Sequence, residues 1–119
     1  MQKAEALKKM AEITLQRLLE TYTINYPSNT LVDYYDVIHK LLEAIAAKQG
    51  IKIKGEGAHQ ELIDYIAKQH RFDEQIRLLL QQMRDYRNRI SYEGFMVPKN
   101  YILIYEKKIK KIIKKLFEL

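Results

Sequence analysis

Residues 87–94, with the sequence RNRISYEG, hold the densest group of side chains able to bind an anion or transfer a proton. Counting about 100° per residue along the preceding segment places one apolar stripe on a helix, formed by Ile76, Leu79, Leu80, Met83 and Ile90. Arg87 falls in the middle of this stripe. A guanidinium keeps its charge in proteins, and burying it without a partner is costly. The position therefore predicts a carboxylate, a subunit interface or an anionic ligand such as a phosphate beside Arg87.

The neighbours of Arg87 extend this polar chemistry. Asn88 can hydrogen-bond a ligand or the carbonyls at the end of the helix, and Tyr92 can stack on a base or occupy a core or interface position. Arg84 and Arg89 are expected at the rim, in contact with phosphate or with water. Arg87 itself has a structural alternative, an internal ion pair with Asp36 or Glu43, and the sequence leaves both readings open.

The positive charge is concentrated toward the end of the chain. The net charge is +6, and residues 84–119 carry ten Lys or Arg against four acids, whereas residues 1–83 carry eleven of each sign. A local excess of one sign indicates an anionic partner or a solvated helix face. An anionic partner would meet the C-terminal third.

Five helices are expected to position these residues. Apolar periodicity predicts helices over residues 2–23, 31–49, 58–69, 72–90 and 98–117, with Pro27, Gly50, Gly94 and Pro98 marking boundaries. Thr30 or Asn29 would cap the second helix, and residues 51–57 would form an extended loop. The expected fold is a single all-α domain over residues 1–119, an up-down bundle of four long helices plus one short helix.

Composition narrows the function classes. The 119 residues are 47% hydrophobic and 30% charged, with no cysteine and no apolar run long enough for a membrane span. These features predict a cytoplasmic protein. His39, His59 and His70 lack metal-ligand spacing, and no glycine-rich phosphate loop is present. We expect no metal and no cofactor.

Three segments resemble the HEPN family (higher eukaryotes and prokaryotes nucleotide-binding domain). They are residues 32–44 (VDYYDVIHKLLEA), residues 57–63 (GAHQELI) and the Arg87-Asn88 pair at the end of a long helix. The resemblance spans nearly the whole chain. It implies a helical bundle that dimerises, with the arginine motifs of two copies lining a shared cleft, and it implies an RNA-cleaving toxin or the partner of a minimal nucleotidyltransferase.

The family motif is Arg, a polar residue and a histidine a few positions later. By resemblance, the catalytic positions are Arg87, Asn88 and Tyr92, with Tyr92 in place of the histidine, and Arg84, Arg87, Arg89 and Tyr92 would bind the nucleic acid or nucleotide. No histidine follows Arg87, and tyrosine is a poor base near neutral pH. The sequence thus predicts a homodimeric RNA- or nucleotide-binding module with a degenerate ribonuclease site. The alternatives are an interaction partner of a nucleotidyltransferase, in a toxin-antitoxin-like pair, and an active metal-independent endoribonuclease.

Overall fold

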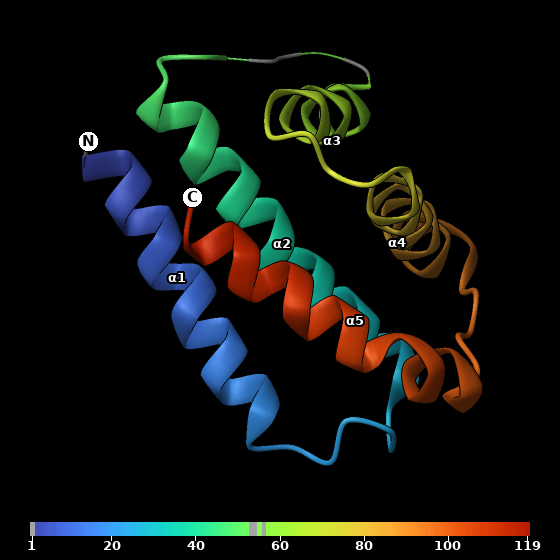
Figure 1. Cartoon of the computed structure of the whole chain (residues 1–119). Coiled ribbons are helices and arrows are strands. Elements are labelled where there is room, and N and C mark those ends of the chain that lie inside the picture. Colours follow the sequence, from blue (N-terminus) through green and yellow to red (C-terminus); the bar gives the residue numbers. More distant parts are fainter. Residues whose placement is uncertain (1, 53–54, 56) are drawn as a thin grey trace.

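The chain folds into helices joined by short loops, as seen in a computed structural model that describes residues 2–52, 55 and 57–119 (Figure 1). Within these residues the secondary structure consists of five helices, without strands, which confirms the all-α class. The helices are α1 (Gln2–Leu19), α2 (Pro27–Lys48), α3 (Ala58–Gln69), α4 (Glu74–Glu93) and α5 (Lys99–Phe117). None of the described helices is both long and apolar enough to pass through a membrane.

Helix α2 is the centre of the fold, because it contacts all four other helices. Apolar residues recur along it every three or four positions and are buried on several sides, including Leu31, Tyr34, Ile38, Leu41 and Leu42. Tyr34 also spans to α5, where its hydroxyl donates to Glu106 Oε2 at 2.7 Å. Burial and this hydrogen bond raise the pKa of Tyr34, so the hydroxyl stays protonated.

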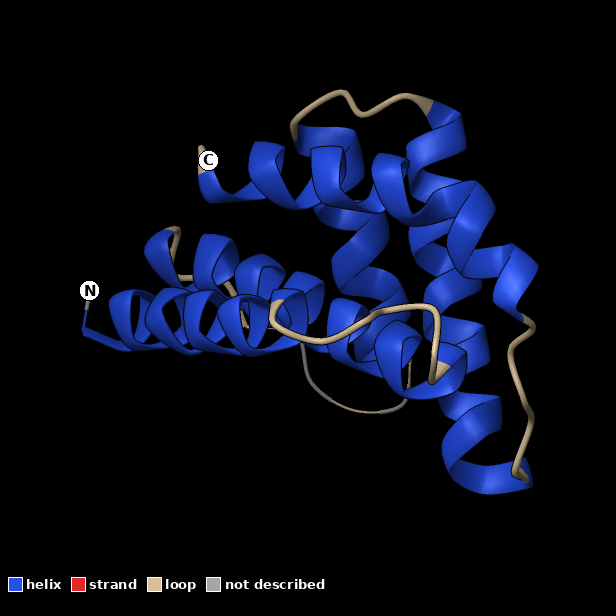
Figure 2. Ribbon diagram, turned by 90° about the horizontal axis from the view of Figure 1, so that it is seen from below, coloured by secondary structure: helices blue, strands red, loops and turns tan. Residues whose placement is uncertain are grey.

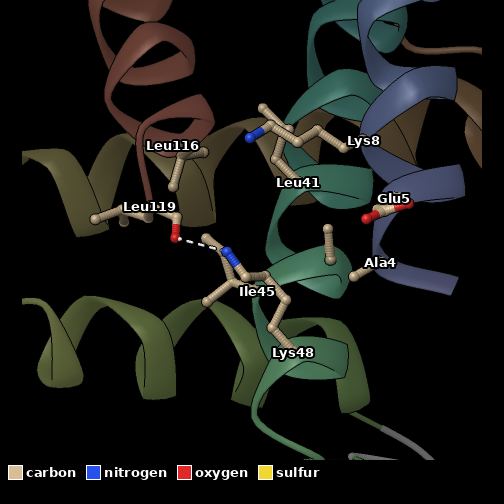
Figure 3. Close-up of a pocket in the computed structure, with 9 residues that line it drawn as sticks. Ala4, Glu5, Lys8, Leu41, Ile45, Lys48, Leu116 and Leu119 are labelled. Atoms are coloured by element: carbon tan, nitrogen blue, oxygen red, sulfur yellow. Dashed lines mark hydrogen bonds between the residues drawn. The ribbon is translucent and has the colours of Figure 1, made fainter. Parts of the chain in front are cut away.

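The helices do not all alternate in direction. Helix α1 and α2 form an antiparallel pair, whereas α5 runs in the same direction as α2 (Figure 1). Hydrogen bonds at both ends confirm the second relation: Val97 N–H donates to Ser28 Oγ at 2.9 Å, and Lys48 Nζ donates to the Leu119 carbonyl at 3.4 Å (Figure 3). Figure 1 views α3 and α4 nearly along their axes, across the other three helices, and Figure 2 shows the same layout from below. The expected up-down arrangement is not confirmed.

Two helix boundaries differ from the sequence expectation by four residues, and α4 runs over Glu74–Glu93 rather than residues 72–90. Helix α1 ends at Leu19 rather than near residue 23, because tight turns follow and the Thr21 hydroxyl bonds the Leu18 carbonyl at 2.6 Å. Helix α2 begins at Pro27, four residues early, since proline fits the first helical turn, where its missing N–H is not needed. The proposed caps Asn29 and Thr30 therefore lie inside the helix, and Thr30 Oγ1 instead donates to the Thr23 carbonyl at 2.6 Å.

The segments around α4 follow the sequence more closely. Asp73 caps its start by accepting the Gln75 N–H at 2.8 Å, and Gly94 ends it with a φ of 69°, a conformation that favours glycine. Helix α3 covers residues 58–69 as expected. Of the expected extended loop at residues 51–57, residues 53, 54 and 56 lie outside the described part of the chain.

Replacing Ile38 tests the central role of α2. Ile38 is fully buried among the surrounding helices, so Ile38→Ala leaves a cavity and is expected to lower the free energy of unfolding by about 2–5 kcal/mol. Urea unfolding measures this loss. The matched control is Leu103→Ala on the exposed side of α5, for which a change within about 0.5 kcal/mol is expected. Equal losses in both variants would contradict the assignment of α2 as the core helix.

Candidate anion-binding site

Arg87 lies where the apolar stripe predicted it. Leu79, Leu80 and Met83 of the stripe are buried, and Arg87, one turn after Met83, is partly buried on the same side of α4. Across the part of the chain that the structure describes, no hydrogen bond or ion pair involves the Arg87 guanidinium. The two acids considered as internal partners are engaged elsewhere: Asp36 pairs with Lys40 at 2.7 Å and Glu43 contacts His39 at 3.2 Å. Neither acid therefore pairs with Arg87.

Tyr35 of α2 is a second residue whose polar group indicates a bound ligand. Its side chain is only 2% exposed, and its hydroxyl is buried without a hydrogen-bond partner among the described residues. Burial raises the pKa of Tyr35 to about 12, against the opposing positive charges of Arg84 and Arg87. A buried hydroxyl left unpaired costs about 1–3 kcal/mol. A ligand oxygen that accepts from Tyr35 and from a guanidinium would relieve both groups.

His39, one turn after Tyr35, is held neutral. Burial, followed by the charges of His59, Lys40 and Arg87, lowers the pKa of His39 to about 4, against the opposing charge of Asp36. The Nδ1 atom lies 3.2 Å from Glu43 Oε1 on the same helix. Its ring also stacks on Tyr35, with centroids 6.0 Å apart.

His59 joins this group from the first turn of α3. Gly57 precedes that turn as the N-cap with a φ of 76°, and the centroid of His59 lies 3.9 Å from that of His39. The two imidazoles and Glu43 line an open cavity of about 550 Å³, whose apolar wall includes Ala46 and Leu62. The cavity is thus bordered by α2, α3, Lys3 of α1, and residues 50–52 and 55.

The other residues predicted for the site differ in burial and in their contacts. Arg84 is partly buried and donates from Nε to Gln81 Oε1 at 2.9 Å, and its charge acts on Tyr35 together with that of Arg87. The Arg89 guanidinium lies 4.2 Å from the centroid of Phe95 and 4.0 Å from Glu93 Oε1. The Asn88 side chain is partly buried and makes no hydrogen bond to the described residues, and Tyr92 is 82% exposed. Within one chain, therefore, the charges of Arg84 and Arg87 both act on the Tyr35 hydroxyl, whereas Tyr92 is exposed to solvent.

Sequence reasoning missed the histidines. It compared them only with metal-ligand spacing and with the motif position after Arg87. The available signal was the polar row Tyr35, His39 and Glu43, which repeats every four residues and so shares one side of α2. Among the described residues, no group of three or more His, Asp or Glu side chains is arranged to hold a metal ion.

The chain was compared with known protein families, with curated proteins and with solved structures, and none of them matches it.

The pKa of His39 makes stability depend on pH. Its folded pKa of about 4 lies below the ordinary value of 6.5, so between these values the unfolded chain binds a proton that the folded chain does not. The free energy of unfolding should therefore fall as the pH decreases from 6.5 to 4. His39→Asn should remove about 2 kcal/mol of that fall, allowing for the partial exposure of the ring. Urea unfolding across this pH range measures the difference between the two proteins.

NMR titration of the His39 ring tests how much Arg87 contributes to the lowered pKa of His39. Arg87→Ala removes a nearby positive charge and should raise the pKa of His39, whereas Arg17→Ala on α1 should leave it unchanged. An unchanged pKa of His39 in Arg87→Ala would show that the guanidinium lies far from this part of α2. It would contradict the grouping of Arg87 with Tyr35 and His39.

Proposed function

We propose that this chain binds RNA or a nucleotide through phosphate, with Arg87 as the principal phosphate ligand. Two observations carry the proposal: a partly buried guanidinium without an anionic partner in the described chain, and a buried Tyr35 hydroxyl without a hydrogen-bond partner there, whose pKa that guanidinium lowers against burial. Arg87 presents a planar fork that matches two phosphate oxygens. Arg84 adds a second charge, and the Tyr35 hydroxyl donates to a phosphate oxygen.

The proposal includes the likeness to HEPN domains and a homodimer. Tyr92, in the last turn of α4, and Met96, in the loop that follows, are 82% and 80% exposed and supply apolar surface for a second copy. In such a dimer, Tyr92 and Asn88 of one copy serve the shared cleft, Tyr92 by stacking on a base and Asn88 by a hydrogen bond. The antiparallel α1 and α2 support the up-down bundle of four long helices and one short helix, whereas the parallel α2 and α5 do not. We place the protein in the cytoplasm.

The ribonuclease site is degenerate in this proposal. Metal-independent RNA cleavage needs a base with a pKa near neutrality, and a pKa of about 4 makes His39 a weak one. The histidines nevertheless give the alternative of an active endoribonuclease a specific basis. They reach the neighbourhood of Arg87 from α2 and α3 rather than from the motif on α4. The other alternative, an interaction partner of a nucleotidyltransferase, rests on the family likeness alone.

RNA binding tests the role of Arg87. We expect wild type to bind single-stranded RNA with an affinity that falls as salt rises, because bound phosphates release counterions. Arg87→Ala should weaken binding at low salt and reduce the magnitude of the salt slope by about one. Fluorescence anisotropy with labelled RNA, repeated over a salt series, measures both quantities.

The matched control for RNA binding is Arg17→Ala. It removes the same charge from an exposed side chain of α1 that only approaches Asp33 at 3.8 Å. Identical RNA binding by wild type and Arg87→Ala would sink the proposal. The mass of the complex reports the oligomer, and a single chain per RNA would remove the shared cleft while leaving the phosphate site.

A cleavage assay separates binding from catalysis. We expect no cleavage of single-stranded RNA near neutral pH, because burial keeps His39 weakly basic. Activity that survives metal chelation and disappears in Arg87→Ala would instead establish an endoribonuclease. The variants His39→Asn and Tyr92→Phe would then identify the side chain that transfers the proton.

A further inference from the structure

A second feature lies between the start of α4 and the middle of α5. It is a groove of about 490 Å³ with an aliphatic floor and a basic rim. The floor residues are Ile76, Ile104 and Ile112, and the rim residues are Lys107, Lys108, Lys111 and Lys115. We call it the lysine groove.

The rim charges are not neutralised within the described part of the chain. Lys108 Nζ only approaches Gln75 Oε1 at 3.5 Å, and Lys115 Nζ lies 4.9 Å from the centroid of Phe72. The nearby acids are engaged elsewhere: Asp73 caps α4, Glu74 binds Arg77, and Glu106 accepts from Tyr34. Four positive charges therefore surround the floor without a counterpart.

The floor decides which class of partner fits. Ile104 is 68% exposed in the midst of the lysines, and solvation of the charges does not account for an aliphatic surface there. The residues that line the groove include no aromatic side chain on which a base could stack and no arginine fork for phosphate. The aliphatic floor and the cationic rim of the groove are complementary to a partner surface that has one apolar stripe with acidic residues on both sides.

We infer that the lysine groove docks an acidic amphipathic helix of a partner protein. From Ile104 to Lys115, α5 rises about 16 Å, the length of three helical turns. A helix of that length places apolar residues on the isoleucines and carboxylates beside the lysines. This surface uses the first turn of α4, whereas Arg87 lies in its last part, so the inference goes beyond the proposed phosphate site and does not depend on it.

A designed peptide tests the inference with the full chain. The probe is a synthetic helix of about three turns with leucine at every third or fourth position and glutamate elsewhere. Its control is a shuffled peptide of the same composition without the apolar stripe. Isothermal titration should show binding of the first peptide and at least tenfold weaker binding of the second.

Neighbouring variants on α5 separate the groove from general effects. Ile104→Ser should weaken peptide binding about tenfold through lost apolar burial, whereas Leu103→Ser, at an adjacent side chain that is 61% exposed, should not. The double variant Lys107→Glu/Lys111→Glu should abolish binding, and Lys8→Glu/Lys9→Glu on α1 should leave it nearly unchanged. The six substitutions in these four variants all replace exposed side chains, and circular dichroism confirms that each variant is folded.

Three outcomes would overturn the inference. Equal binding of the shuffled peptide would show that charge alone attracts it. Unchanged binding by Ile104→Ser would remove the apolar floor from the contact. RNA binding that weakens in Ile104→Ser as much as peptide binding does would show that the groove takes nucleic acid instead. None of these results involves Arg87, so the phosphate site would stand or fall on its own experiment.

Discussion

Burial of α2 is the constraint on which the other features of this fold depend. The helix contacts α1, α3, α4 and α5. Each buried polar group along it must therefore form a hydrogen bond inside the protein to replace its lost hydrogen bonds with water. Tyr34 meets this demand through Glu106, and Asp36 meets it through Lys40. Tyr35 does not, because its hydroxyl has no partner in the described structure. This buried hydroxyl without a hydrogen-bond partner is the physical reason to look for a ligand near Tyr35.

The electrostatics around Tyr35 are consistent with an anion rather than a metal cation. Arg84 and Arg87 bring positive charge from α4, and burial together with that charge keeps His39 neutral. A phosphate would compensate the guanidinium and accept from the tyrosine. It would also favour protonation of His39, so phosphate binding and the charge state of the imidazole are expected to be coupled.

The two basic surfaces differ in the chemistry that they offer. Arginine near Tyr35 provides a rigid, partly buried fork, which suits directional recognition of phosphate oxygens. The lysine groove provides mobile, solvated charges around aliphatic side chains, which suits carboxylates spaced along an amphipathic helix. In our two proposals, the net charge of +6 that is concentrated in residues 84–119 serves two different kinds of binding surface.

The sequence by itself determined the helical class, the position of all five helices and the phase of Arg87, since these follow from local periodicity, glycine and proline. It erred where local signals compete: Thr30 resembled a cap, but Pro27 already provides a suitable first turn. Only the tertiary structure decided that α5 runs parallel to α2, that Arg87 has no ion-pair partner among the described residues, and that the ring centroids of His39 and His59 lie 3.9 Å apart. These relations join residues 20 or more positions apart, and their geometry depends on how α2, α3, α4 and α5 pack, which no local pattern encodes.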